Sequence, residues 1–302
     1  NSAIALASIS RDPTTGASKT MSHTTLIDAS TLHAHRNDPN WVVMDCRFSL
    51  ADPEAGRRAY RDSHLPGAHY AHLDEDLSDP ITPITGRHPL PDPERLAQKL
   101  GAWGIGHDTQ VVAYDDMGGM LAAARLWWLL RWLGHTACAV LDGGLPAWRR
   151  AGLPLTAEIP AARPTAFVSR PDDRLWMSTE QVLTLSATEV LLDARAAARY
   201  RGEMEPIDPV AGHIPGALNL PTDGNLTPEG HFLPVAALRE RFAAALNDRS
   251  PATVIHACGS GVTACHNLLA MEAAGLRGSR LYAGSWSEWI RDPQRAVAVG
   301  AV

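Results

Sequence analysis

The fold is decided by residues 253–275, which read Thr-Val-Ile-His-Ala-Cys-Gly-Ser-Gly-Val-Thr-Ala-Cys-His-Asn-Leu-Leu-Ala-Met-Glu-Ala-Ala-Gly. The apolar run 253–256 predicts a strand, Cys258 to Thr263 a tight loop, and 262–274 a helix. Strand, loop and helix in this order are typical of a parallel α/β sheet, where ligands bind at the carboxyl ends of the strands. Cys258 therefore lies where such a fold places its site.

The loop predicts an anion-binding site with Cys258 as a nucleophile. Gly259 and Gly261 allow the backbone to fold closely around the thiol. The first N–H groups of the helix, and the positive end of its dipole, point to the same place. These groups should hold the sulfur as a thiolate, which is its reactive form. We expect Gly259, Gly261, Val262 and Thr263 to contact the substrate.

Two sequence motifs occur twice in the chain. Val42-Val-Met-Asp-Cys-Arg47 is followed by His64-Leu-Pro-Gly-Ala68, and Val190-Leu-Leu-Asp-Ala-Arg195 by His213-Ile-Pro-Gly-Ala217. The copies stand about 140–150 residues apart. A fixed offset between motifs in the same order indicates a tandem duplication.

The duplication predicts two domains, at 21–152 and 176–302, joined by a Pro- and Ala-rich linker at 153–175. Asp115 in the first domain stands where the second has Cys258. Alternating strand and helix patterns predict an α/β fold in which each domain is a mostly parallel sheet flanked by helices.

The expected elements are assigned from apolar periodicity and from turn residues. Strands are expected at 41–44, 68–71, 110–114 and 138–141, and at 189–192, 217–219, 253–256 and 280–282. Helices are expected at 93–101, 119–133, 179–187, 235–246 and 262–274.

Composition excludes several classes of protein. A net charge of −6 argues against a nucleic-acid-binding surface. Four cysteines without a Cys-x-x-Cys pair predict free thiols in a reducing cytoplasm and no metal site. The most apolar run, Met120 to Leu133, contains two arginines and is too short to span a membrane. Residues 1–20 are interpreted as a cloning remnant, with Met21 as the natural start.

The repeated motifs and the single loop cysteine resemble the two-domain rhodanese sulfurtransferases. The stretches Cys258–Ala264 and Gly284–Trp289 are most similar to the 3-mercaptopyruvate branch, because the thiosulfate branch carries Arg and Lys at the positions of Gly259 and Ser260. The resemblance implies two rhodanese-like domains and no cofactor. It also implies a two-step reaction, in which Cys258 takes a sulfane sulfur from a small donor, becomes a persulfide, and passes the sulfur to cyanide or a thiol.

The resemblance further implies roles for individual side chains. Ser260 matches a serine that relays a proton, and His64 matches a first-domain histidine that orients it. Asp52 is the nearest aspartate that could complete this relay. Arg199 matches the first of two arginines that bind the carboxylate of mercaptopyruvate, and Trp286 is expected at the edge of the pocket.

The second arginine of that pair has no counterpart, because Ile207 and Asp208 stand in its place. Either a neighbouring arginine (Arg201, Arg57 or Arg58) substitutes for it, or the donor is thiosulfate or another small molecule. The donor is therefore left open, with 3-mercaptopyruvate favoured over thiosulfate.

Two functions of other classes were weighed against sulfur transfer. A cysteine phosphatase has the same strand, loop and helix, but needs an arginine six positions after its cysteine, where Ala264 stands. Because the loop also lacks any basic residue, it predicts a cradle without a cation and excludes the phosphatase. A non-catalytic persulfide carrier is the second alternative. Thioredoxin is a candidate thiol acceptor, and neither nucleic acid nor a membrane is expected as a partner.

Overall fold

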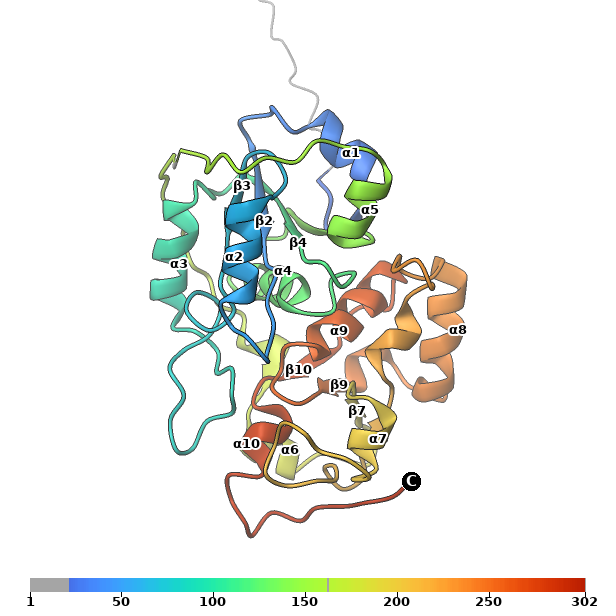
Figure 1. The fold of residues 1–302 in the computed structure, drawn as a ribbon. Helices are drawn as coiled ribbons and strands as arrows, with labels where there is room; N and C mark the ends of the chain where they lie inside the picture. Colours follow the sequence, from blue (N-terminus) through green and yellow to red (C-terminus); the bar gives the residue numbers. More distant parts are fainter. Residues whose placement is uncertain (1–21, 162, 302) are drawn as a thin grey trace, which may run out of the picture.

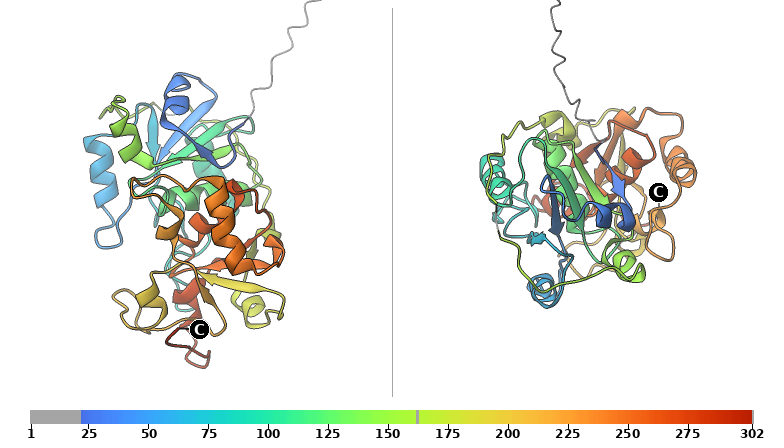
Figure 2. Two further views of the ribbon diagram at one scale, coloured as in Figure 1. Left: turned by 90° about the vertical axis from the view of Figure 1, so that its right-hand side faces the viewer. Right: turned by 90° about the horizontal axis from the view of Figure 1, so that it is seen from above.

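The computed structural model describes residues 22–161 and 163–301. It contains two parallel sheets, one from each half of the chain, and the two halves are stacked one above the other (Figures 1 and 2). The predicted remnant at 1–20 and the predicted start at Met21 lie outside the described residues.

The two sheets have the same topology. The first contains β1 (Leu26–Ile27), β2 (Trp41–Asp45), β3 (Ala68–Tyr70), β4 (Gln110–Tyr114) and β5 (Cys138–Leu141), in the order β1-β5-β4-β2-β3. The second contains β6 (Trp176–Met177), β7 (Val190–Asp193), β8 (Leu218–Asn219), β9 (Val254–Ala257) and β10 (Arg280–Tyr282), in the order β6-β10-β9-β7-β8. Each strand thus has its counterpart five places later, and all neighbours are parallel, which confirms the predicted fold.

Helices cover both sheets. In the first half they are α1 (Ala29–Ala34), α2 (Ala55–Asp62), α3 (Pro93–Ala102), α4 (Ala122–Trp132) and α5 (Gly144–Arg150). In the second half they are α6 (Thr179–Leu183), α7 (Ala197–Tyr200), α8 (Val235–Leu246), α9 (Ala264–Ala273) and α10 (Ser285–Trp289). Short 3₁₀ turns lie at Asp173–Leu175, Thr222–Asn225 and Pro251–Thr253.

The predicted strands are all present, with ends within one residue of the predicted ones. The helix predicted at 119–133 begins later, at Ala122, because Gly118 and Gly119 have left-handed φ angles of 66° and 86°. The helix predicted at 179–187 ends at Leu183. There the Thr184 hydroxyl bonds to backbone carbonyls of the last turn and competes with continuation of the helix.

The Asp-x-Arg and His-x-Pro-Gly-Ala motifs build one structural corner in each domain. The Arg47 guanidinium donates to the buried Asp45 carboxylate at 2.6 Å, and Arg195 donates to Asp193 at 2.7 Å. The corner histidine stacks on a tyrosine in both copies, His64 on Tyr60 and His213 on Tyr200. These charged pairs therefore hold loops in place.

The two domains share a hydrophobic interface. Helices α4 and α9 pack against each other, and Leu126, Leu130 and Leu269 belong to one continuous buried cluster (Figure 1). A long loop between β3 and α3 also crosses to the second domain near α10. There the N–H of Arg87 donates to Ser287 Oγ at 3.0 Å, and a Cβ on Gly86 would lie 2.8 Å from the Gly284 carbonyl oxygen. This contact fixes Arg87 and its neighbours beside the second domain.

Candidate active site

Cys258 directly follows β9, at the carboxyl end of the second sheet, and is buried. Its N–H donates to Ser285 Oγ at 3.0 Å, and its carbonyl oxygen accepts the N–H of Trp286 at 3.0 Å. The start of α10 thus holds both backbone polar groups of the cysteine. Trp286 itself is buried, and its indole N–H donates to the Val210 carbonyl, so it packs under the site rather than at the edge where we expected it.

The loop after Cys258 leaves its N–H groups available. No backbone N–H of residues 259–264 donates a hydrogen bond to another residue in the described part of the chain. Gly261 has a φ of 72°, and a Cβ there would lie 2.2 Å from the Ala283 carbonyl oxygen, so only glycine fits. Val262 is buried, and Thr263 precedes the first residue of α9. These free donors precede and begin α9, and free N–H groups at a helix N-terminus are a common site for anions.

A chain of hydrogen bonds leads from the loop into the first domain. Ser260 Oγ lies 2.7 Å from His88 Nδ1, and His88 Nε2 lies 3.1 Å from Asp74 Oδ1. Because a carboxylate only accepts, His88 carries its proton on Nε2, and its Nδ1 accepts the Ser260 hydroxyl. Burial lowers the pKa of His88 below 6.5, against an opposing effect of Asp74, which keeps the imidazole neutral at pH 7. Ser260, His88 and Asp74 therefore form a chain of hydrogen bonds across the domain interface.

The relay corrects the expected partner of Ser260. His64 stacks on Tyr60 at 4.0 Å, and its ring nitrogens contact the carbonyl oxygens of Tyr60 and Glu158. His64 is thus part of the first-domain corner, as His213 is of the second. Its predicted contact with Ser260 is wrong.

Asp52 is also outside the relay. It is exposed and pairs with Arg58, and the hydrogen bond from that guanidinium lowers the pKa of the carboxyl. Neither group contacts the loop that carries Cys258. Asp74 occupies the position that we had assigned to Asp52.

Two arginines flank the residue after the nucleophile. A Cβ on Gly259 would lie 2.8 Å from Arg87 Nη2 and 3.7 Å from both terminal nitrogens of Arg199. Arg199 also donates to Glu205 at 2.7 Å and to Asp208 at 3.2 Å, and Arg87 pairs with the other oxygen of Asp208. The first domain thus places a second arginine, Arg87, beside Gly259.

The three arginines proposed as substitutes lie elsewhere. Arg57 pairs with Glu75 at 2.5 Å, Arg58 with Asp52, and Arg201 with Glu203 at 2.7 Å, all at the surface. The prediction that Arg201 binds substrate is not supported by its position.

A third arginine, Arg125 of α4, is fully buried at the interface. It donates to the carbonyl oxygens of Gly261 at 3.1 Å and of His88 at 3.3 Å. The Arg125 guanidinium thereby connects the loop after Cys258 to the segment that carries His88. Arg87, Arg125 and Arg199 also show that the cradle without a cation, which the loop sequence predicted, is wrong, because the charges come from other elements.

Sequence reasoning missed His88, Asp74 and Arg87. They lie in the irregular segment between β3 and α3, which has no periodicity. The only signal was the polar Gly86-Arg-His-Pro89 run in an otherwise turn-rich stretch, and the motif that contains His64 outweighed it.

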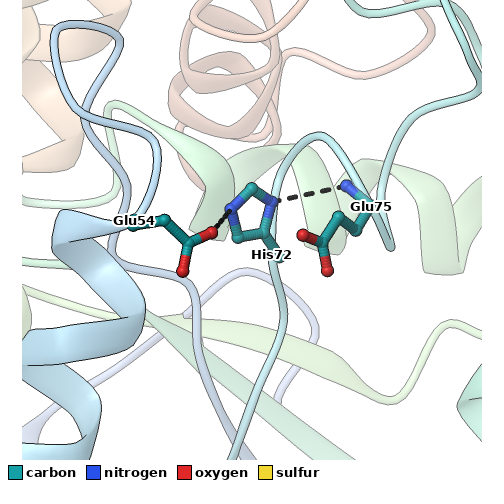
Figure 3. Close-up of side chains that lie close together, drawn as sticks. All are labelled: Glu54, His72 and Glu75. Atoms are coloured by element: carbon teal, nitrogen blue, oxygen red, sulfur yellow. Dashed lines mark hydrogen bonds and ion pairs between the residues drawn. The ribbon is translucent and has the colours of Figure 1, made fainter.

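A group of possible metal ligands lies behind Asp74. Figure 3 shows Glu54, His72 and Glu75, whose ligand atoms lie within 4.8 Å of one another. Both nitrogens of His72 are already engaged, since Nδ1 accepts the N–H of Asp74 at 3.2 Å and Nε2 lies 3.1 Å from the Pro53 carbonyl oxygen. The ring therefore braces the turn that presents Asp74 and has no free lone pair for a metal.

The site thus combines a buried cysteine before a helix N-terminus with a Ser-His-Asp chain of hydrogen bonds and two nearby arginines. This combination suits the transfer of a small group through a covalent intermediate. The rhodanese-like domain model matches residues 28–151 and 178–292. The chain therefore belongs to the rhodanese family, and it is a sulfurtransferase.

Relatives of known type cover almost the whole chain. It is 52% identical to a Pseudomonas aeruginosa protein named "Probable 3-mercaptopyruvate sulfurtransferase", over 93% of this chain and 100% of that protein. It is 35% identical to the thiosulfate sulfurtransferase of Cricetulus griseus, over 87% and 90%. The solved structure of SseA from Escherichia coli, described as a 3-mercaptopyruvate sulfotransferase, matches with a TM-score of 0.75 and 32% identity, over 88% of this chain and 100% of that one.

These relatives are enzymes, which sets aside the non-catalytic carrier as an alternative. Within residues 22–161 and 163–301, no helix has the length and apolar character needed to cross a membrane.

Proposed function

We propose that this enzyme uses 3-mercaptopyruvate as its sulfur donor and that Cys258 carries the sulfur. The Cys258 thiolate attacks the thiol sulfur of the donor, and the carbon–sulfur bond breaks. The electron pair of that bond stays on carbon as the enolate of pyruvate. The N–H groups of residues 259–264 stabilise the anionic sulfur before and after the transfer.

The relay accounts for the proton in this reaction. The donor's thiol proton passes to Ser260 Oγ while the Ser260 hydroxyl proton moves to His88 Nδ1, and the reverse transfer delivers a proton to the enolate carbon. The products are pyruvate and a Cys258 persulfide anion, so atoms and charge balance. Arg87 and Arg199 bind the carboxylate of the donor beside Gly259.

The observation that carries the choice of donor is the 2.7 Å contact between Ser260 and His88. Mercaptopyruvate needs a proton on the departing carbon, whereas thiosulfate leaves as sulfite and needs none. A buried relay with a neutral histidine serves only the first of these donors. Thiosulfate remains the second candidate, because a relative at 35% identity bears that name.

Kinetics with the two donors on wild type and Ser260→Ala test this proposal. With 3-mercaptopyruvate and cyanide, the variant should lose about 100-fold in kcat. With thiosulfate and cyanide it should change by less than about threefold, since no proton is moved. Equal losses with both donors would assign Ser260 to the cradle rather than to a relay.

The persulfide then passes its outer sulfur to an acceptor. Cyanide attacks that sulfur, the sulfur–sulfur bond breaks, and thiocyanate and the Cys258 thiolate result. We further propose a thiol acceptor such as thioredoxin and a reducing, cytoplasmic setting. The four cysteines are free and buried, which suits that setting.

A further inference from the structure

Asp208 occupies an unusual position for a carboxylate in a site for anionic donors. Its side chain is only 3% exposed, and its two oxygens meet two different guanidinium groups. Oδ1 pairs with Arg87 Nη1 from the first domain, and Oδ2 lies 3.2 Å from Arg199 Nη2 from the second. A single carboxylate therefore bridges the two arginines that flank Gly259.

The remaining donors of these arginines face the catalytic loop. Arg87 Nη2 is the atom nearest to the open side of Gly259, and Arg87 Nε has no hydrogen-bond partner among the described residues. Arg199 Nη1 lies 3.7 Å from the same point. An anion bound next to Cys258 would use these donors and would share both guanidiniums with Asp208.

We propose that Asp208 is a built-in competitor for the anionic end of the sulfur donor and sets how strongly the site attracts negative charge. The carboxylate cancels much of the positive field of Arg87 and Arg199 at the nucleophile. A donor must therefore draw the guanidiniums away from Asp208, which weakens the binding of anions. This inference rests on the proposed role of the two arginines and deepens it.

The proposal predicts a gain when the charge of Asp208 is removed. Asp208→Asn keeps the size of the side chain and one accepting oxygen, but it removes the carboxylate that pairs with Arg87 and leaves Arg199 with Glu205 alone. The KM for 3-mercaptopyruvate should fall by about tenfold at low salt, as expected for one unit charge within a few ångströms of the ligand. Added salt should reduce that gain, because ions screen partly exposed charges.

Alkylation of Cys258 measures the same field without relying on any donor. Iodoacetate is an anion, iodoacetamide is neutral, and both place a similar group on the sulfur. The ratio of their rates, iodoacetate over iodoacetamide, should rise by about tenfold in Asp208→Asn. It should fall in Arg87→Gln, where Asp208 keeps only Arg199 as a partner. Cys258→Ser identifies alkylation at the other cysteines.

Glu203→Gln is the matched control. Glu203 lies in the same segment, is exposed, and pairs with Arg201 away from the site. Removing its charge should leave the ratio unchanged, and thermal melting of each variant reports whether the fold is intact.

The outcomes separate the possibilities. The proposal is overturned if folded Asp208→Asn shows no rise in the iodoacetate-to-iodoacetamide ratio and no fall in the KM for 3-mercaptopyruvate. Asp208 would then only hold the two arginines in place. If Asp208→Asn does not fold, an unchanged ratio in Arg87→Gln overturns it equally. A wild-type protein that turns over no mercaptopyruvate would refute the proposed donor, while the alkylation ratio would still test Asp208.

Discussion

The loop after β4 and the loop after β9 are copies of one design, and they hold different groups. In the first domain Asp115 Oδ1 accepts the N–H groups of Met117 at 2.9 Å and Gly119 at 2.8 Å, and Oδ2 accepts that of Leu121 at 3.1 Å. In the second domain Cys258 stands in the same place, and the corresponding N–H groups have no partner among the described residues. The first loop is thus filled by its own carboxylate, and the second is left for a bound anion.

The comparison indicates that the N–H donors come from the backbone of the loop and are present whether a carboxylate or a cysteine precedes them. Burial raises the pKa of Asp115 to about 6, although the three N–H groups oppose the shift. A carboxylate in such a position is a permanent occupant, whereas a cysteine sulfur can take on and release a second sulfur. The duplication therefore supplied one loop that supports the interface and one that does chemistry.

A second difference lies at the first residue of α5 and of α10, the helices that follow β5 and β10. Gly144 has a φ of 55° and Ser285 a φ of 52°, so the two copies share a left-handed residue. Glycine adopts this conformation without strain, but serine does so at a cost. In return, the Ser285 hydroxyl accepts the N–H of Cys258 and donates to the Tyr282 carbonyl at 2.9 Å. The strain is kept in the domain that holds the nucleophile.

The largest effect should come from replacing the nucleophile. Cys258→Ser should reduce sulfur transfer by more than about 1,000-fold with any donor, because an alcohol does not form the persulfide. The thermal melting curve should stay that of the wild type. A double variant with Asp115→Cys should not restore activity, since the first loop has no relay beside it. Turnover in either variant would contradict the comparison of the two loops.

Substitutions of the two first-domain histidines should distinguish a residue that acts in the reaction from a residue that only stabilises the fold. His88→Gln should lower kcat with 3-mercaptopyruvate by about 100-fold, because Ser260 loses its proton acceptor. His64→Gln should leave kcat within about twofold of the wild type and lower the melting temperature instead, since it removes corner contacts. A large loss of kcat in His64→Gln, with the fold intact, would return the relay to His64.

The relay also predicts how activity depends on pH. Because the pKa of His88 is lowered below 6.5, the neutral form needed to accept the Ser260 proton persists at pH 7 and is lost only as the pH falls below that range. Asp74 opposes this lowering, so Asp74→Asn should move the acid limb of the kcat profile to still lower pH while kcat itself falls about tenfold. A limb that moves upward would contradict the assignment.

Replacing the carboxylate of the first loop should cost stability and not chemistry. Asp115→Asn exchanges one accepting oxygen for an NH₂ group that faces N–H donors, so at least one buried donor loses its partner. The free energy of unfolding should fall by about 1–3 kcal/mol. Urea denaturation gives this value, and kcat per folded enzyme serves as the control. A stability equal to the wild type would mean that the loop is not held by its carboxylate.

The smallest effect should come from relieving the strain at Ser285. Ser285→Gly makes the second domain like the first at this position and leaves the Cys258 N–H without its acceptor. We expect the free energy of unfolding to stay within about 1 kcal/mol of the wild type and kcat to fall about tenfold. A loss of kcat without a loss of stability would mark Ser285 as a positioning residue, whereas parallel losses would mark it as structural.

Residues close together in the chain were enough to predict the duplicated fold and to propose Cys258 as the nucleophile. Strands, glycine-dependent turns and the Cys-Gly-x-Gly loop depend on residues that are close in the chain, so they leave a local signal. Gly261 illustrates this, because its φ and the carbonyl of Ala283 admit no other residue. Ser260 and Arg199 belong to the same domain as Cys258, and the structure places both beside the loop.

The groups that complete the site could be identified only from the packing of the two domains. His88, Asp74 and Arg87 come from the other domain, from a loop whose path no periodicity reveals, and they meet the catalytic loop because α4 packs on α9 and the loop docks on α10. His64 belongs to a motif that occurs twice and yet lies in a corner of its own domain, because a repeated motif reports local backbone geometry and not the distance to the other domain. Local sequence therefore determines the backbone shape and the side chains of each loop. The packing of the two domains determines which groups from the first domain lie beside Cys258.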